Sequence, residues 1–307
     1  MQTACNSGSK CLVPQLSDTY DNVRSIFEQT IFINKNTMNT KTKIILKTLY
    51  FNCLSMINIP IFYLLGRRMK YKRVMENLKD SHLGDSCFVI CNGPSLRPED
   101  LDKIHEKGYY SIGINFISGI YSRTKWRADM VIRNERTLPF RRYLKPKTLP
   151  EKGVIIKNQR DYFTSLLQKG KKIYVKIDGD RKYLDTPKFS TNGTELLYSV
   201  GTSTYLALEM AYHLGFRKIF IIGCDMSYAV NMRKDGTIYY NKDGKNYFYE
   251  DNNSIPKNVY PNPTWEQIVA LDFVEKFSRE NGFRVYNATR GGCCESFERI
   301  DFDTLMK

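Results

Sequence analysis

The sequence predicts an α/β protein with a Rossmann-like, mostly parallel sheet, helices on both of its faces and an N-terminal helical extension. Three observations support this fold class. From Ser86 onward, short β-rich segments alternate with helical ones, which is typical of βαβ units. Several of the strands are almost wholly apolar, as expected for strands covered on both faces. The 307 residues, 42% hydrophobic and 26% charged, suit one large domain with extensions or at most two domains, and they exclude global disorder.

The domain from 81 to 307 contains the predicted sheet. Strands are expected at Cys87–Asn92, Tyr110–Asn115, Met130–Arg133, Val154–Lys157, Lys172–Ile177, Lys218–Gly223 and Arg284–Asn287. Helices are expected at Pro98–Glu106, Asp161–Gln168, Thr202–Leu214 and Thr264–Arg279. The first of these helices begins with a proline, which is tolerated there because the first helical N–H has no partner to lose. Residues 233–262 show no clear period, and a loop this long in a compact domain is usually functional, so we expect a lid.

The extension, residues 1–80, is basic. The chain carries a net charge of +15, and no Asp or Glu occurs between Glu28 and Glu76, where nine Lys and Arg lie. Ile44–Leu65 is apolar, but Lys47 and Pro60 interrupt it, so it is a poor membrane span. Its basic flanks suit a helix lying on an anionic membrane surface. A helix packed on the surface of the domain itself is the other interpretation.

The cysteines and the N-terminus bear on the compartment. None of the eight cysteines shows the paired spacing of a zinc site, and residues 1–30 lack the apolar segment of a cleavable signal. We therefore expect reduced thiols in a cytoplasmic protein, peripheral on the inner face of the cell membrane. Nucleic acid is not an expected partner, because the cations flank an apolar segment and no DNA- or RNA-binding motif is present. The sequence does not predict the oligomeric state.

The turn Asn92-Gly93-Pro94-Ser95 follows the first predicted strand. In open α/β sheets, ligands bind outside the carboxyl ends of the strands. Gly93 allows the backbone to approach a ligand, Asn92 and Ser95 supply short polar side chains, and the next helix offers free N–H groups to a phosphate. The turn matches neither the dinucleotide-binding nor the Walker glycine pattern. An ordinary turn is the alternative, but its position after a buried strand favours nucleotide binding.

Two further asparagines follow predicted strands, Asn115 after the second and Asn134 after the third. A polar side chain at such a position either caps the next turn or touches a ligand. With Asn92 they form three asparagines at three strand ends, which suggests recognition of a base or ribose by neutral hydrogen bonds.

A second nucleotide-binding segment surrounds residues 201–228. Gly201, Thr202 and Ser203 open a helix whose N–H groups and hydroxyls suit a phosphate. An apolar strand then delivers Asp225 to the carboxyl edge, where it would bind a ribose hydroxyl, hold Mg²⁺ or cap the following turn. Tyr228 is expected to face the same crevice.

The last predicted strand ends in a glycine-containing turn that includes Asn287 and Arg290. Asn287 arrives at the same edge of the sheet as the other candidates. Arg290, followed by two glycines, would clamp an anion, although a surface arginine in a loop is the equal alternative.

Together these motifs resemble a known family. The segments Val89–Leu96, Gly201–Asp225 and Tyr286–Phe297 resemble the MptE-like family, named for an archaeal 6-hydroxymethylpterin diphosphokinase. Bacterial relatives in that family are associated with cell-surface glycans or flagellin glycosylation. The resemblance runs from about Ser86 to the C-terminus and implies a Rossmann-like nucleotide-binding domain.

The family 42 sialyltransferases are a more distant likeness. They share the Asn-Gly-Pro-Ser turn, and in that family the turn and the strand-end asparagines hold a CMP-sugar. The likeness therefore implies that the nucleotide is contacted by Asn92, Gly93, Ser95 and Asn115, with Asn134 a looser match. That family uses a histidine as general base before the helix that here begins near Thr264, where this chain has none. Other candidates for the base lie in the long loop, namely Tyr239, Tyr240, Asp243, Glu250, Asp251 and Tyr260.

Three functions follow from this pattern. The first is a transferase of surface-polysaccharide synthesis that uses a nucleotide-activated sugar donor and a glycan or lipid-linked acceptor, with Asp225, Asp243, Glu250 and Asp251 as catalytic candidates. The second is pyrophosphoryl transfer from ATP to a pterin alcohol, with Mg²⁺ held by Asp225, Glu250 and Asp251. The third is a non-catalytic nucleotide-binding subunit of a glycan assembly complex.

Overall fold

The computed structural model describes residues 53, 56–134, 153–162, 165, 170–242, 244–248 and 263–307. The chain divides into two compact units, Met1–Leu54 and Ser55–Lys307, and all the described residues except Cys53 belong to the second. Residues 55–80, which we expected within the extension, therefore belong to the same unit as the sheet.

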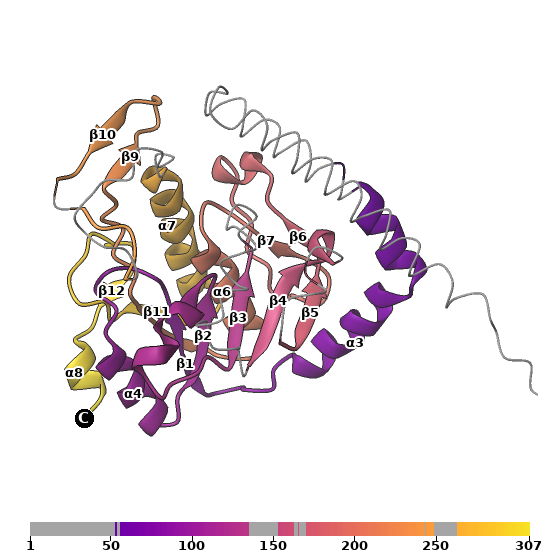
Figure 1. Ribbon diagram of the computed structural model, residues 1–307, viewed down its shortest axis with the longest axis horizontal. Helices are drawn as coiled ribbons and strands as arrows, with labels where there is room; N and C mark the ends of the chain where they lie inside the picture. The colour runs from indigo at the N-terminus through magenta and orange to yellow at the C-terminus, as the bar shows by residue number, and fades with distance from the viewer. Residues whose placement is uncertain are drawn as a thin grey trace, which may run out of the picture. The chain divides into compact units, whose positions relative to one another are not determined.

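The centre of this unit is an eight-stranded sheet in which every pairing among the described strands is parallel (Figure 1). The order is β12-β11-β8-β1-β2-β3-β4-β5. The chain first builds outward from β1 to β5 and then returns to the other side of β1 with β8. The strands are β1 Ser86–Ile90, β2 Tyr110–Ile114, β3 Met130–Arg133, β4 Val154–Asn158, β5 Lys172–Val175, β8 Lys218–Ile222, β11 Arg284–Asn287 and β12 Glu298–Arg299.

Alternate residues of the strands enter two different hydrophobic cores, because successive side chains in a strand point to opposite faces. In β1, Cys87 and Val89 join one core, and Phe88 and Ile90 join the other. The sheet is therefore covered on both faces, as the sequence predicts, and the α/β Rossmann-like fold class is confirmed.

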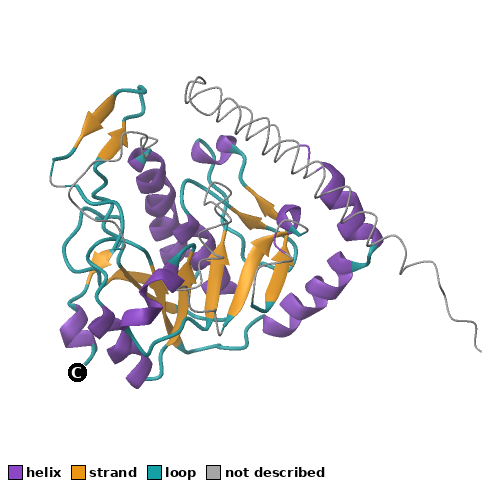
Figure 2. Cartoon of the chain, in the orientation of Figure 1, coloured by secondary structure: helices purple, strands orange, loops and turns teal. Residues whose placement is uncertain are grey.

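Helices cover both faces of the sheet (Figure 2). On one face, α6 contacts β1, β2 and β3, and α7 contacts β11. On the other, α4, α8 and the 3₁₀ segment Ile117–Arg123 supply the second core. The helices are α3 Arg67–Leu78, α4 Pro98–Glu106, α6 Ser203–His213, α7 Thr264–Glu280 and α8 Phe302–Leu305.

All seven predicted strands occur, and four short ones were not predicted separately: β7 Leu197–Tyr198, β9 Val230–Met232, β10 Ile238–Tyr240 and β12. The predicted strand Lys172–Ile177 is divided, because β5 ends at Val175 and β6 Ile177–Asp178 pairs with β7 in a separate sheet. The predicted loop Arg233–Asn262 contains β10, which forms a hairpin with β9. Most of the predicted helix Asp161–Gln168 lies outside the described residues.

The described part of Ile44–Leu65 is helical from Met56 to Leu64. Its inner side is fixed by Phe62, which is fully buried against Tyr71, Tyr162 and Tyr174. Within the described ranges, no helix is long and apolar enough to cross a membrane.

Candidate functional site

A pocket of about 250 Å³ lies where the carboxyl ends of β1 and β8 meet. This is the switch point of the sheet, because the chain turns one way after β1 and the other way after β8, and such points are where open α/β sheets bind ligands. The lining comes from four places: the strand ends, the start of α6, the 223–228 turn and the segment after the β9–β10 hairpin. Its residues are Cys91, Asn92, Gly93, Ile114, Asn115, Gly201, Thr202, Ser203, Thr204, Gly223, Cys224, Asp225, Met226, Ser227, Tyr228, Lys245, Asn246, Tyr247 and Gln267.

Asp225 holds the turn after β1 from the neighbouring strand. The backbone N–H of Ser95 donates to Asp225 Oδ1 at 3.2 Å, and Ser95 Oγ donates to Oδ2 at 2.7 Å. Gly93 N–H donates to the carbonyl of Gly223 at 2.8 Å. A Cβ at position 93 would overlap Asp225 Oδ2, so only glycine fits this close approach. Burial raises the pKa of Asp225, while the bonds from Ser95 oppose that rise.

Asn92 presents an unused acceptor in the lining of the pocket. Its Nδ2 donates to the carbonyl of Ile114 at 3.0 Å, which fixes the orientation of the amide. Its Oδ1 is buried and accepts no hydrogen bond from the described residues, although the residue is only 7% exposed. A buried acceptor without a partner costs stability, so such a group in a pocket points to a ligand with an O–H or N–H donor.

The other strand-end asparagines are linked to the start of α6. Asn115 Nδ2 donates to Ser203 Oγ at 3.2 Å, and Asn115 Oδ1 accepts from the backbone N–H of Asn134 at 3.4 Å. Asn134 Nδ2 donates to Ser199 Oγ at 2.8 Å. Asn115 therefore lines the pocket, whereas Asn134 supports it from one strand further along.

The N-terminus of α6 contributes Gly201, Thr202, Ser203 and Thr204 to the lining of the pocket. Thr202 caps the helix, since its side chain accepts from the N–H of Thr204. The unpaired N–H groups of the first helical turn carry partial positive charge and suit an anion. Lys245 lines the same pocket and makes no ion pair with the described residues.

Two non-glycine residues of the lining have left-handed backbone conformations. Asn115 has φ 46° and Met226 has φ 53°. Asparagine tolerates this region, but a methionine there costs of the order of 1 kcal/mol. Such strain is concentrated at functional sites in proteins, and here both residues are part of one pocket.

A C-terminal loop, residues 289–295, supports Asp225 from behind. Gly292 packs on it so closely that a Cβ would lie 2.8 Å from Asp225 Cα, and Cys293 N–H donates to the carbonyl of Asp225 at 2.7 Å. The hydroxyl of Thr289 accepts from the N–H of Cys224 at 3.2 Å. The loop therefore fixes the backbone on both sides of the peptide that joins Cys224 to Asp225.

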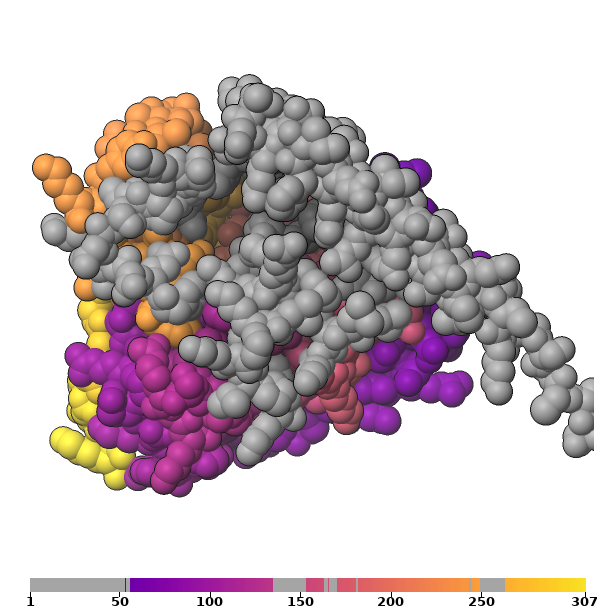
Figure 3. Space-filling view, viewed as in Figure 1, coloured from indigo at the N-terminus to yellow at the C-terminus, as the bar shows by residue number. Residues whose placement is uncertain are grey.

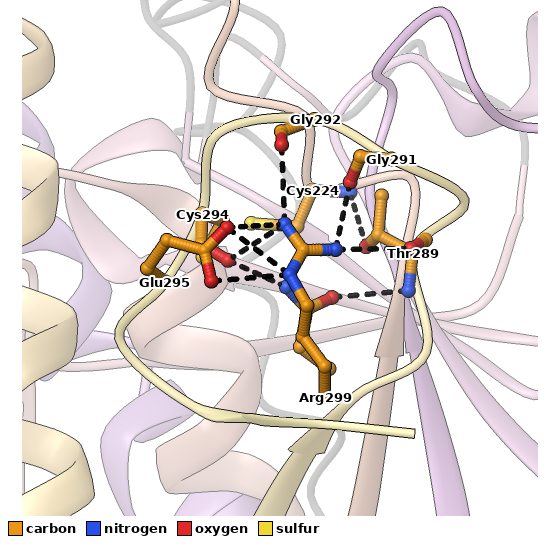
Figure 4. Close-up of polar contacts among 8 residues, drawn as sticks. Cys224, Thr289, Gly291, Gly292, Cys294, Glu295 and Arg299 are labelled. Carbon is orange, nitrogen blue, oxygen red and sulfur yellow. Dashed lines mark hydrogen bonds and ion pairs between the residues drawn. The ribbon is translucent and has the colours of Figure 1, made fainter. Parts of the chain in front are cut away.

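Arg299 donates hydrogen bonds to several carbonyls of this loop, as Figure 4 shows. It makes an ion pair with Glu295 at 2.7 Å as well. Because the planar guanidinium carries five donors, one side chain can hold several carbonyls at once. The carbonyls that accept from it are those of Thr289, Gly291, Gly292 and Cys294.

The thiols of the described residues are free. Cys91 and Cys224 line the pocket. Hydrogen bonding with the thiols of Cys294 and Cys91, together with burial, raises the pKa of Cys224. In the part of the chain that the structure describes, no group of three or more acidic, cysteine or histidine side chains could hold a metal ion.

Asn287 and Arg290, both predicted to bind the ligand, bond to other parts of the chain and do not line the pocket. Asn287 is used by the C-terminal loop: its Nδ2 donates to the carbonyl of Cys294 at 2.7 Å, and its Oδ1 accepts from Thr289 N–H at 3.0 Å. Arg290 makes a bidentate pair with Asp100 of α4 at 2.7 and 2.9 Å and also bonds Asp303. Its guanidinium joins α4 to α8 and is not available as an anion clamp.

The other predicted residues differ in where the structure places them. Asn92, Gly93, Asn115, Gly201, Thr202, Ser203, Asp225 and Tyr228 line the pocket, and Ser95 bonds Asp225. Pro94 is in the turn but is not part of the lining. Asp243, Glu250, Asp251 and Tyr260 lie outside the described residues; Tyr239 and Tyr240 are on β10.

Sequence reasoning missed several lining residues: Lys245, Asn246, Tyr247 and Gln267. The first three belong to the loop that was expected to be a lid, and the signal for them was a Lys-Asn-Tyr sequence after Gly244. Gln267 had no signal, because its role depends on Tyr228, whose hydroxyl donates to Gln267 Oε1 at 3.2 Å.

The fold and the pocket define this chain as a Rossmann-like α/β protein with a polar cavity at the switch point of its sheet. Comparison of the sequence with protein-family models and with curated proteins finds no match. The resemblance to the MptE-like family therefore stays a prediction that depends on the three motifs.

Proposed function

We propose that the protein is a transferase that binds a nucleotide-activated sugar in the pocket between β1 and β8. The observation that carries this proposal is the buried Oδ1 of Asn92, an acceptor without a described protein partner in a residue that lines the pocket at the switch point. The lining is more polar than apolar, and much of it comes from backbone turns and short polar side chains, which suits a hydroxyl-rich and phosphate-bearing ligand better than an apolar one.

The pocket has an acceptor side and a donor side. Asn92 Oδ1 and the Asp225 carboxyl group supply acceptors, so this side suits hydroxyl or amino groups of the ligand. The Asp225 carboxylate would repel a phosphate placed at the Ser95 turn. The start of α6 and Lys245 supply donors and positive charge, so we place the phosphates there and the sugar hydroxyls at Asn92.

For the acceptor, we propose a glycan or a lipid-linked sugar at the inner face of the cell membrane, with the enzyme cytoplasmic and peripheral. The general base is proposed among Asp243, Glu250 and Asp251. Asp243 is two residues from Lys245 in the sequence, and Lys245 lines the pocket. A carboxylate that removes a proton from an acceptor hydroxyl is ordinary transferase chemistry.

Two other functions are distinguished by their ligands. Pyrophosphoryl transfer would require ATP with Mg²⁺, and only Asp225 of its proposed ligands is among the described residues. A non-catalytic subunit would bind a nucleotide without turning it over.

A thermal-shift screen tests the proposal. CMP, UDP, GDP and ATP are each added with and without Mg²⁺. A ligand that binds only the folded state raises Tm, and at a concentration of 100 times its Kd it stabilises the protein by about 2.7 kcal/mol. We expect stabilisation by one nucleoside mono- or diphosphate without metal. The same nucleotide should stabilise Asn92→Leu and Lys245→Ala much less, whereas Lys276→Ala, an exposed change on α7, should respond like the parent.

Three results would contradict the proposal. Stabilisation by ATP only in the presence of Mg²⁺ would favour pyrophosphoryl transfer. No stabilisation by any nucleotide would exclude the site as proposed. An equal response of parent, Asn92→Leu and Lys245→Ala proteins would place the nucleotide elsewhere.

A further inference from the structure

The helix from Met56 to Leu64 has its apolar side toward solvent. The side that packs on the sheet unit contains Asn58, whose Nδ2 donates to the carbonyl of Arg160 at 3.0 Å, and Phe62. The opposite side contains no charged residue, and all its members are exposed: Met56, Ile57, Pro60, Tyr63 and Leu64. We call these five residues the apolar face. A surface helix normally shows the reverse arrangement, with polar residues outward.

The exposure of this face is large. Leu64 is 84% exposed and Met56 is 76% exposed. After a left-handed turn at Gly66, φ 63°, Met69 of α3 adds a further apolar side chain that is 57% exposed. Single exposed apolar residues need no explanation, but a contiguous exposed group marks an interaction surface.

Cations accompany the apolar face in two groups on α3. Arg68 and Lys72 both pair with the single carboxylate of Glu195, so their charges are compensated in part. Lys70 and Arg73 are exposed and make no ion pair with the described residues. α3 surfaces at one edge of the molecule, as Figure 3 shows.

We propose that the apolar face and the exposed cations Lys70 and Arg73 dock on a membrane surface that contains anionic lipids. Apolar side chains would enter the boundary between headgroups and acyl chains, and the two cations would contact lipid phosphates. The surface acts without any segment that spans the bilayer. This inference does not depend on the nucleotide site, although it gives a physical basis for the membrane location within the proposed function.

Charge decides between a lipid surface and a second copy of this chain. The described segment that carries this surface, residues 56–73, contains five Lys and Arg and no Asp or Glu. Two copies that met through this surface would therefore bring like charges together, and like charges disfavour association. An anionic leaflet offers the opposite charge.

Vesicle co-sedimentation of the full chain tests the proposal. We expect binding to phosphatidylcholine vesicles that contain about 30% phosphatidylglycerol, because an anionic surface attracts basic segments, and much weaker binding to phosphatidylcholine alone. The charge variant Lys70→Glu with Arg73→Glu should lose about twentyfold or more in partitioning, because each cation near the surface is worth about a factor of five. Ile57→Gln with Leu64→Gln should lose binding at every salt concentration.

Matched controls are available elsewhere in the unit. Ile238→Gln removes an exposed apolar side chain of β10, and Lys276→Glu reverses an exposed charge of α7; neither should alter vesicle binding. The far-ultraviolet circular dichroism spectrum and Tm of each variant show that it is folded.

Three outcomes would overturn the proposal. The parent protein fails to bind anionic vesicles. The folded charge and apolar variants bind as well as their controls. Light scattering shows a dimer that Leu64→Gln converts to monomer while vesicles have no effect, which would assign the apolar face to a second copy. Because no nucleotide is present in these assays, their failure and the failure of the nucleotide site are distinguishable.

Discussion

Replacing Gly93 with alanine tests the close approach between the turn after β1 and the strand end of β8. The added Cβ would overlap Asp225 Oδ2 and would lie 2.7 Å from Asp225 Cγ and 2.5 Å from the carbonyl oxygen of Gly223. Two of the three neighbours belong to a side chain held by two hydrogen bonds, and the third is backbone, so the turn must move.

The magnitude follows from two contributions. Inserting a methyl group into a packed site typically costs about 1–3 kcal/mol. Displacing Asp225 from Ser95 removes two hydrogen bonds to a carboxylate, and a hydrogen bond to a charged group contributes about 1.5–3 kcal/mol to stability. Because the turn can relax in part, we expect a loss of about 2–4 kcal/mol in the free energy of unfolding, measured by urea denaturation, together with loss of nucleotide stabilisation.

Gly179→Ala is the matched control. Its Cβ would meet Ser199 Cβ at an ordinary 3.5 Å, and its φ is not left-handed, so this change should be neutral or slightly stabilising. Asp225→Ala removes the carboxyl group that the new methyl would overlap, so the double variant should lose less than the sum of the single losses. If Gly93→Ala is as stable as Gly179→Ala, the packing of the switch point is not as described.

Three further predictions concern other parts of the unit. Arg299→Ala should lower the free energy of unfolding by about 1–3 kcal/mol and make the 289–295 loop more sensitive to proteolysis, because the loop carbonyls lose their donor. The control Arg279→Ala breaks a surface pair with Glu275 and should cost at most about 0.5 kcal/mol. Equal effects of the two changes would contradict the role of Arg299 in holding the loop. Burial lowers the pKa of His213, whose Nδ1 accepts from Gly193 N–H. The unfolded chain therefore binds the proton more readily, and the free energy of unfolding should fall as pH drops below about 6.5. His213→Asn should show a shallower decline, and equal slopes of the free energy of unfolding against pH in the two proteins would refute this prediction. Among the described cysteines, Cys53 and Cys293 should react with a maleimide in the native protein, as mass spectrometry would show, while modification of Cys87 at a similar rate would contradict its full burial.

The sheet could be predicted from the sequence because buried parallel strands are short apolar segments with clear ends. Pro98 and the polar residues after β1 mark those ends directly. The pairs β6–β7 and β9–β10 were missed because each strand has two or three residues, too few for a periodic pattern. Their existence depends on tertiary pairing.

The candidate site could be predicted where strand ends determine it. Asn92, Asn115 and Asp225 follow buried strands, and a parallel sheet brings these positions to one edge. Arg290 and Asn287 were expected there for the same reason, but tertiary packing decides which residues their side chains bond. Asp100 is 190 residues from Arg290, and no local pattern predicts that pair. The contributions of Lys245 and Gln267 likewise depend on how the loop and α7 pack.

A crystal structure of the protein with the nucleotide that raises its Tm most would test directly whether the pocket between β1 and β8 binds it. We expect the nucleotide between β1 and β8, with its phosphates at the N-terminus of α6 beside Lys245 and a sugar or base donor hydrogen-bonded to Asn92 Oδ1. A nucleotide bound away from this pocket, or one with its phosphates against Asp225 and Ser95, would contradict it.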